Sequence, residues 1–363
     1  MTPLGRLLAR RIELSGPIPV AVFMAEALGH PAHGYYVTRD PLGARGDFTT
    51  APEISQLFGE SLAVWAIETW QRMGAPSRAH LVELGPGRGT LLQDLLRVAK
   101  AAPDFAAAVD LHLVETSPTL RAAQAQRLDR YGPRWHQSFD TVPDDAPLLL
   151  IANELFDALP IRQFVRVDGA WHERLVGLDE NGAGFRFVLA PGRSPLAAGI
   201  APSDAPDGSV FELSPASLSL MGAIASRIAA RTGCALVIDY AGGVGDTLQA
   251  VRGHARADVL VDPGESDLTA HVDFTALARV ARESGAVAHG PLGQGELLQR
   301  LGITARFDAL CERATDTQAK TLASGLTRLV SDDGMGVLFR AIAIGTDGLV
   351  PCGFEECGVE TVE

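Results

Sequence analysis

The segment VELGPGRGTLL, residues 82–92, is the feature that most constrains what this chain can fold into. The apolar run before it predicts a buried strand ending at Glu83 and Leu84, and a helix is predicted from Thr90. Glycine lets the backbone turn sharply and approach a ligand closely, while the first N–H groups of a helix point at polar groups of that ligand. We therefore predict a parallel α/β sheet with a nucleotide cofactor above this turn. The predicted contacts are Gly85, Pro86, Gly87 and Gly89.

The chemistry of the turn distinguishes two kinds of cofactor. The dinucleotide fingerprint Gly-x-Gly-x-x-Gly requires a third glycine where this chain has Thr90. The carboxylate of Glu83 repels a pyrophosphate, whereas it attracts the sulfonium and amino groups of S-adenosylmethionine. The turn therefore favours S-adenosylmethionine and a methyltransferase. A nicotinamide-dependent oxidoreductase on a related sheet is the alternative.

Strand and helix patterns alternate on both sides of the turn, which predicts parallel strands joined by right-handed crossovers. The alternation is interrupted at about 161–213, where short strand-like runs joined by Gly, Asp, Asn and Pro predict an inserted antiparallel region. We predict strands at 79–85, 110–116, 134–139, 147–156, 234–241 and 335–345, and helices at 55–73, 90–100, 117–130, 215–231 and 274–284.

Side chains at the ends of the next two strands are candidates for binding the nucleoside. Glu115 closes the second strand, where nucleotide-binding sheets place a carboxylate against the ribose hydroxyls. Its alternative role is to cap the helix that starts at Ser117. Ser138 and Phe139 follow the third strand at a position that can flank an adenine ring, and ordinary loop packing is the alternative.

A polar cluster follows the fourth strand, where Asn153, Glu154 and Asp157 fall at the carboxyl edge of the sheet. Paired carboxylates there suit a cationic acceptor such as a guanidinium, and one of them can receive a proton during methyl transfer. We predict Glu154 and Asp157 as catalytic residues and Asn153 as a cofactor contact. The alternative is that Asp157 caps a short helix while Glu154 is solvated. Methyl transfer from a sulfonium needs no metal, and none is predicted.

The bulk properties of the chain narrow its class and its partners. A formal net charge of −13 over 363 residues disfavours nucleic acid as a partner. We predict a cytoplasmic protein without membrane insertion, because no run of eighteen apolar residues occurs and the four cysteines are scattered. Cys352 and Cys357 are read as part of an exposed tail rather than as a metal site.

Six motifs together carry a resemblance to a known family. They are GPIPVAVFMAEALGHPAHGYY, DPLGARGDFTTAPEISQLFGE, VELGPGRGTLL, NELFDALPIRQF, VIDYA and DLTAHVDFTAL. With them the chain resembles the MidA-like methyltransferases over nearly its whole length, up to the last strand. The resemblance implies a class I, Rossmann-like fold with seven mostly parallel strands and S-adenosylmethionine as methyl donor. It also implies a protein arginine as acceptor, as in the family member that assembles respiratory complex I.

The resemblance also implies roles for residues that the patterns alone leave open. The loop GDFTTAPEIS is then a lid over the cofactor, with Asp47, Thr49 and Thr50 as cofactor contacts and Glu53 near the substrate. In DLTAHVDF, His271 and Asp273 are implied to line the acceptor pocket, although Asp273 also suits the N-cap of the following helix.

Three parts are predicted along the chain: an N-terminal helical and loop extension (1–75), a methyltransferase domain (76–345) and a tail (346–363). The domain is expected to contain the antiparallel insertion at about 161–213 and a helical insertion at about 293–330. A protein substrate is expected, a complex I subunit being one possibility, and a homodimer is one possible oligomeric state. The rival from another functional class is a non-catalytic assembly factor that retains the cofactor pocket.

Overall fold

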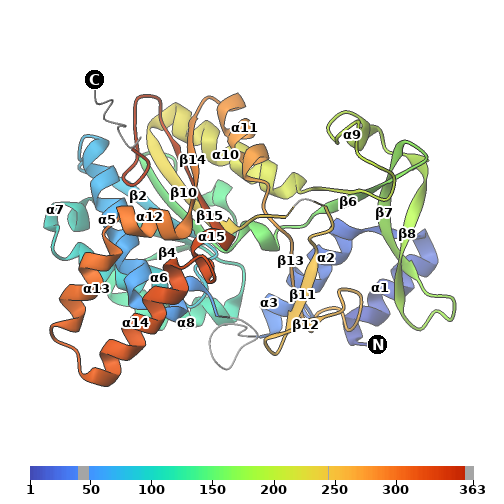
Figure 1. Cartoon of the computed structure of the whole chain (residues 1–363), viewed down its shortest axis with the longest axis horizontal. Helices are drawn as coiled ribbons and strands as arrows, with labels where there is room; N and C mark the ends of the chain where they lie inside the picture. Colours follow the sequence, from blue (N-terminus) through green and yellow to red (C-terminus); the bar gives the residue numbers. More distant parts are fainter. Residues whose placement is uncertain (40–48, 244, 356–363) are drawn as a thin grey trace.

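The chain is built around a seven-stranded sheet, seen in the computed structural model of residues 1–39, 49–243 and 245–355 (Figure 1). The strand order is β14-β15-β10-β5-β2-β3-β4. The five strands from β10 to β4 are parallel, while β15 is antiparallel to both of its neighbours. The predicted mostly parallel seven-stranded sheet is therefore confirmed. Its strands are β2 (Ala79–Leu84), β3 (Val109–Val114), β4 (Arg134–His136), β5 (Leu148–Asn153), β10 (Gly233–Tyr240), β14 (Val287–Gly293) and β15 (Phe339–Gly345).

Helices cover both faces of this sheet, which explains why its central strands are apolar on both sides. Every residue of β2 and β5 is buried. Alternate residues of these strands point into two separate cores, one under α5, α6, α7 and α12 and the other under α10 and α11. The helices are α5 (Gln56–Arg72), α6 (Thr90–Ala99), α7 (Pro103–Ala108), α8 (Pro118–Leu128), α10 (Pro215–Arg231) and α11 (Phe274–Glu283).

The N-terminal helices and the antiparallel strands form a second body beside the sheet, on the right of Figure 1. The predicted N-terminal extension and antiparallel insertion are both present, and a third core joins α1 and α2 to strands β1, β7 and β13. A small sheet of β11, β12 and β13 was not predicted, because its strands have only three or four residues. The elements are α1 (Pro3–Ser15), β1 (Ile18–Pro19), α2 (Val20–Gly29), α3 (Tyr35–Thr38), α4 (Ala51–Ile54), β6 (Arg162–Val167), β7 (Ala170–Leu178), β8 (Phe185–Arg193), α9 (Pro195–Ala198), β9 (Val210–Leu213), β11 (Gln249–Arg252), β12 (Ala255–Ala257) and β13 (Asp267–Thr269).

The last hundred residues contain two features that the sequence patterns did not predict. Strand β14 was missed because Gly290 and Pro291 interrupt it. The exposed-tail interpretation is wrong for the segment up to Phe354, because Leu349, Cys352 and Phe354 are buried against the core that contains α5 and α12. Cys357 lies outside the described residues. The helices here are α12 (Gln294–Arg300), α13 (Ile303–Cys311), α14 (Asp316–Val330) and α15 (Met335–Leu338).

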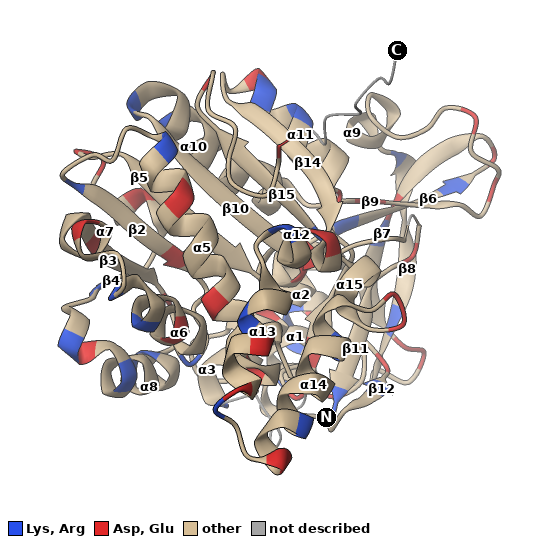
Figure 2. Cartoon of the chain, turned by 60° about the vertical axis from the view of Figure 1, so that its left-hand side comes forward, with Lys and Arg blue, Asp and Glu red and all other residues tan. Residues whose placement is uncertain are grey.

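Basic and acidic residues are interspersed over the outer helices, so the net negative charge is not gathered on one side of the molecule (Figure 2). Within the described residues, no helix is long and apolar enough to cross a bilayer.

Candidate active site

A cavity of about 550 Å³ opens at the carboxyl ends of β2, β3 and β5. This is the edge of an open parallel sheet where ligands bind, and the volume suits a cofactor-sized molecule. Most of the residues predicted to contact the cofactor line this cavity. They are Thr50, Glu83, Gly85, Pro86, Gly87, Glu115, Ser138, Phe139 and Asn153, together with the predicted catalytic Glu154 and the predicted substrate residue Glu53.

The glycine turn has the backbone that only glycine adopts freely. Gly85, Gly87 and Gly89 have φ angles of +63°, +53° and +79°. A Cβ atom at Gly85 would lie 2.9 Å from Cδ1 of Leu155, so a side chain there would be strained by the positive φ and would also require the Leu155 side chain to shift. Gly89 itself precedes α6 and packs against Leu128 rather than lining the cavity. Its predicted direct contact with cofactor stays a prediction.

Glu83 brings an unpaired carboxyl to the wall of the cavity. Its side chain is 3% exposed, and its Oε2 atom has no hydrogen-bond partner among the described residues. Burial, and secondarily the charge of Glu115, raises the pKa of Glu83 to about 8. A buried carboxyl left without a partner is costly, and a cation bound in the cavity would relieve that cost.

Glu115 lines the cavity and also holds the loop that precedes α8, while its contact with the ribose stays a prediction. Its Oε1 atom accepts a hydrogen bond of 2.8 Å from the Ser117 N–H, and its Oε2 atom accepts one of 3.1 Å from Gln124 Nε2. The Ser117 hydroxyl provides the side-chain cap of α8, so Glu115 holds the loop before the helix. The two bonds leave acceptor capacity on a carboxylate that lines the cavity.

Asn153 and Glu154 form the polar wall at the end of β5. Glu154 Oε1 accepts hydrogen bonds from Ala51 N (2.8 Å) and Asn153 Nδ2 (3.0 Å), so the carboxylate is held by the protein. The Oδ1 atom of Asn153 is buried without a partner among the described residues. Burial raises the pKa of Glu154 to about 7, and its φ of +51° is unusual for a residue other than glycine.

Asp157 lies just outside the cavity in an acidic cluster that also contains Asp239 and Asp267. Burial is the main cause that raises the pKa of Asp157 far above its ordinary value, followed by the charges of Asp239 and Asp267. The short helix at Phe156–Ala158 has no side-chain cap, so the alternative of Asp157 as a capping residue is not what the structure shows.

Asp239 was missed by sequence reasoning as a functional residue. It is fully buried near the end of β10, and its Oδ2 atom accepts hydrogen bonds from the N–H groups of Leu155 (3.0 Å), Phe156 (2.7 Å) and Asp157 (3.3 Å). Asp239 thus fixes the turn that presents Glu154. The available signal was an acidic residue inside the apolar run VIDYA at the carboxyl end of a strand.

The segment at 49–54 closes one side of the cavity through α4. Thr50 and Glu53 line it, Glu53 Oε1 accepts a hydrogen bond from Thr90 Oγ1, and Glu53 Oε2 lies 3.5 Å from Arg88 Nη1. These contacts tie the segment to the glycine turn. Thr49 lines a neighbouring hollow instead of the cavity, and the predicted contact Asp47 lies outside the described residues.

His271 and Asp273 are not brought to this cavity. The ring of His271 packs 4.9 Å from that of Tyr240, and its Nδ1 atom is buried without a partner among the described residues. Asp273 is exposed, and its Oδ1 atom accepts a hydrogen bond of 2.9 Å from Ala276 N at the start of α11. Helix capping therefore accounts for Asp273, as the sequence allowed.

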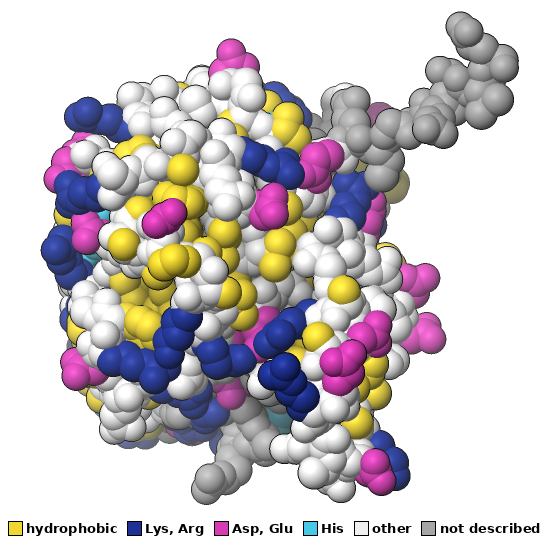
Figure 3. Space-filling view, turned by 90° about the vertical axis from the view of Figure 1, so that its left-hand side faces the viewer, with side chains coloured by type: hydrophobic (Ala, Val, Ile, Leu, Met, Phe, Trp, Pro, Cys, Tyr) yellow, Lys and Arg dark blue, Asp and Glu magenta, His cyan; other side chains and the backbone are white. Residues whose placement is uncertain are grey.

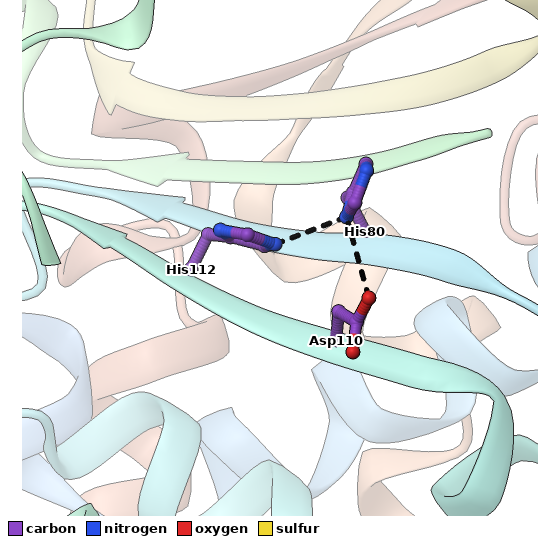
Figure 4. Close-up of side chains that lie close together, drawn as sticks. All are labelled: His80, Asp110 and His112. Atoms are coloured by element: carbon purple, nitrogen blue, oxygen red, sulfur yellow. Dashed lines mark hydrogen bonds and ion pairs between the residues drawn. The ribbon is translucent and has the colours of Figure 1, made fainter. Parts of the chain in front are cut away.

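A second polar cluster lies away from the cavity, where His80 and His112 are buried beside Asp110 (Figure 4). His112 Nε2 lies 3.0 Å from His80 Nδ1, and His80 Nδ1 lies 4.0 Å from Asp110 Oδ2. Burial lowers the pKa of His112 to about 4 and also lowers that of His80. Both rings are therefore neutral at pH 7.

The residue types of this cluster suit a transition metal, but their contacts indicate a hydrogen-bonded chain. The remaining ring nitrogens are paired, His80 Nε2 with Asp145 Oδ1 at 2.8 Å and His112 Nδ1 with His136 Nε2 at 2.9 Å. Arg78 donates to Asp110 at 2.8 Å and to Asp145 at 2.7 Å. The positive charge of the Arg78 guanidinium beside Asp110 and Asp145 would repel a metal ion bound there. The network links β2, β3 and β4.

Comparison with known proteins decides the class of chemistry. The model of a family described as "Putative S-adenosyl-L-methionine-dependent methyltransferase" matches residues 61–292. The chain belongs to this family. Its cofactor is S-adenosylmethionine, it is a methyltransferase, and the alternative of a nicotinamide-dependent oxidoreductase is set aside.

Relatives agree with this assignment over nearly the whole chain. The protein named "Protein arginine methyltransferase NDUFAF7 homolog, mitochondrial" of Drosophila melanogaster is 38% identical, covering 94% of this chain and 84% of that protein. The human "Protein arginine methyltransferase NDUFAF7, mitochondrial" is 37% identical, covering 95% and 83% of the two chains. The predicted resemblance is therefore confirmed.

Solved structures confirm the class I methyltransferase fold. A Burkholderia thailandensis protein described as a candidate methyl transferase, bound to S-adenosyl-homocysteine, superposes with a TM-score of 0.83 at 28% identity. The alignment covers 97% of this chain and 92% of that protein. The ligand named for that structure is the demethylated product of S-adenosylmethionine, which fits the cofactor of the family.

Proposed function

We propose that this methyltransferase transfers its methyl group to an arginine side chain of a protein. The observation that carries the proposal is the acidic wall at the end of β5, where the Glu154 carboxylate lines the cavity with Asp157 and Asp239 behind it. A guanidinium is a planar cation that forms paired hydrogen bonds with carboxylates. The names of the relatives, which are protein arginine methyltransferases, support the same acceptor.

The residues of the cavity divide into two groups in this proposal. Glu83 attracts the sulfonium and amino groups of the cofactor, Glu115 binds the ribose hydroxyls, and Ser138 with Phe139 flanks the adenine. S-adenosylmethionine supplies an electrophilic methyl group on a positively charged sulfur. Asn153 Oδ1, buried and unpartnered, is an acceptor available to a bound N–H group.

Glu154 orients the acceptor guanidinium and receives its proton. Methyl transfer is an in-line displacement, so much of the rate comes from holding the attacking nitrogen in line with the methyl carbon. A protonated guanidinium is a poor nucleophile, and a carboxylate with a pKa of about 7 is matched to accept a proton near neutral pH. Besides burial, the charge of Asp239 is among the effects that raise the pKa of Glu154, and negative charge behind Glu154 favours a cation beside it.

The direct test is incubation of the purified protein with methyl-labelled S-adenosylmethionine and an extract of cells that lack its gene. The expected result is a labelled protein in which mass spectrometry identifies methylarginine, and a rate of labelling about a hundredfold lower with the Glu154→Gln variant. Label on lysine, on carboxylates or only on small molecules would contradict the arginine acceptor. Normal cofactor binding without any labelled product would indicate the non-catalytic assembly factor.

The finer features of the biological setting remain part of this proposal. A subunit of respiratory complex I is the proposed protein substrate, and the cytoplasm is the proposed compartment. The names of the relatives place those proteins in mitochondria. A homodimer is the proposed oligomeric state, which sedimentation of the purified chain would test.

A further inference from the structure

A second hollow, of about 520 Å³, lies beside the cofactor cavity between α14 and the segment at 49–54. One face of α14 forms its wall, through residues spaced three and four positions apart as on one side of a helix. Gly325 allows this approach, because a Cβ atom there would lie 2.9 Å from Cβ of Ser55. The lining residues are Thr49, Glu53, Ile54, Thr317, Lys320, Thr321, Ser324, Gly325 and Arg328.

The hollow is cationic in a protein whose formal net charge is −13. Lys320 and Arg328 are exposed, and neither side chain forms a hydrogen bond or an ion pair with another described residue. Among the described residues that line it, Glu53 is the one acidic residue, and its carboxylate already accepts a hydrogen bond from Thr90 and lies beside Arg88. Helix α14 is on the left of Figure 1, and on this side Lys and Arg side chains gather across the lower half of the surface (Figure 3).

The hollow adjoins the cofactor cavity. Glu53 lines both spaces, so they meet at this side chain. Burial raises the pKa of Glu154, and the positive charge of Arg328 is among the weaker effects that oppose the rise. Arg328 therefore lies close enough to influence the carboxylate that we assign to the acceptor arginine.

We propose that this hollow, through Lys320 and Arg328, binds an acidic side chain that flanks the acceptor arginine in the protein substrate. The inference rests on the proposed function and specifies its substrate: an arginine near an aspartate or glutamate. Charge complementarity supports it, because two unpaired cations attract carboxylates and repel the basic segments that often surround other arginines. Because Glu53 lines both spaces, a peptide whose arginine lies at Glu154 would have a flanking acidic residue within reach of α14.

A carboxylate of the cofactor is the competing occupant of the hollow. S-adenosylmethionine ends in an amino acid, and the carboxylate of that group could also be attracted by Arg328. The two occupants make different predictions for variants of the cations. A substrate site changes the Michaelis constant for the protein acceptor, whereas a cofactor site changes the affinity for S-adenosylhomocysteine.

The chain has only two lysines, Lys100 and Lys320, which permits a test without turnover. Lys100 follows α6 and does not line the hollow, so it is an internal control. The protein loaded with S-adenosylhomocysteine is treated with acetic anhydride in the presence of one of two synthetic peptides. The peptides are identical apart from glutamates or glutamines around a single arginine, and peptide mass spectrometry measures acetylation.

The expected result is a severalfold loss of acetylation at Lys320 with the glutamate peptide only, and no change at Lys100. Equal acetylation of Lys320 with both peptides would overturn the inference. A parallel reaction with S-adenosylmethionine in place of S-adenosylhomocysteine measures methylation of the same two peptides. Protection of Lys320 without methylation of either peptide would support the acidic-segment site and count against arginine as the acceptor. The failures of the two proposals are therefore distinguishable.

A charge-reversal variant, Lys320→Glu with Arg328→Glu, tests the same site by kinetics. We expect its KM for the glutamate peptide to rise by about tenfold, with the affinity for S-adenosylhomocysteine nearly unchanged. Arg313→Glu is the matched control, because Arg313 is an exposed base near α14 that does not line the hollow. A loss of S-adenosylhomocysteine affinity in the double variant would assign the hollow to the cofactor and overturn the inference.

Discussion

The turns after β2 and β5 lie next to each other at the carboxyl edge of the sheet, but they are held in different ways. The turn after β2 depends on three glycines with positive φ, which are within five residues of one another. The turn after β5 depends on Asp239, which is more than eighty residues further along the chain. One shape is thus encoded locally and the other by a long-range contact, which has consequences for how each responds to substitution.

The largest expected effect is at the glycine turn. Gly87→Val should abolish detectable binding of S-adenosylhomocysteine, because Gly87 lines the cofactor cavity and a β-branched residue is strained at its φ of +53°. Titration calorimetry measures the affinity, and circular dichroism checks that the fold is retained. Wild-type affinity in this variant would show that the turn does not carry the cofactor.

The turn after β5 should respond through stability as well as activity. Asp239→Ala leaves the N–H groups of Leu155 and Phe156 without their acceptor, so we expect the free energy of unfolding to fall by at least about 2 kcal/mol. Urea denaturation measures the change. Asp273→Ala is the control, since loss of this exposed helix cap costs about 1 kcal/mol. Equal losses in the two variants would remove the special role of Asp239.

Glu154→Gln should separate catalysis from cofactor binding. The amide keeps the size of the side chain but cannot take a proton, so kcat should fall by about a hundredfold. The affinity for S-adenosylhomocysteine should change by no more than about threefold, because the substitution removes an interaction with the acceptor and not one with the cofactor. Steady-state kinetics and calorimetry provide the two numbers. The assignment fails if affinity falls while kcat is kept.

The pH dependence is the smallest of these effects. Because burial raises the pKa of Glu154 to about 7, the carboxylate form increases as the pH rises through 7, and kcat should rise with it. The sign for stability is the opposite. Because its pKa is raised, Glu154 binds its proton more tightly in the folded state than in the unfolded state. Its contribution to the free energy of unfolding is therefore fully present below about pH 4.5 and is lost as the pH rises through about 7. Steady-state kinetics of the wild type at a series of pH values should show kcat rising through about pH 7.

The same contrast explains how much could be predicted from the sequence. The glycine turn, the helix that begins near Ser117 and the alternation of strands and helices are local signals, and each was predicted in its observed place. Asn153 and Glu154 were placed at the cavity because they follow an apolar strand directly. The resemblance to a family extended this to Thr50 and Glu53 of the covering segment.

Long-range contacts account for what was missed. The role of Asp239 depends on pairing between β10 and β5, which brings residues distant in sequence together. Strand β14 and the buried segment at 349–354 lack regular patterns and take their structure from packing against the core. The cationic hollow requires α14 to meet Ser55, and no spacing within α14 shows where that helix docks.

The most direct test of the central claim compares the affinity of the wild type and of Glu83→Gln for S-adenosylmethionine. The buried, unpaired carboxyl of Glu83 with its pKa of about 8 should bind the cationic donor more tightly as the pH rises toward 8. Glu83→Gln should weaken binding by about tenfold or more at pH 8 and remove most of this pH dependence. Equal affinities and equal pH profiles in the two proteins would contradict the account.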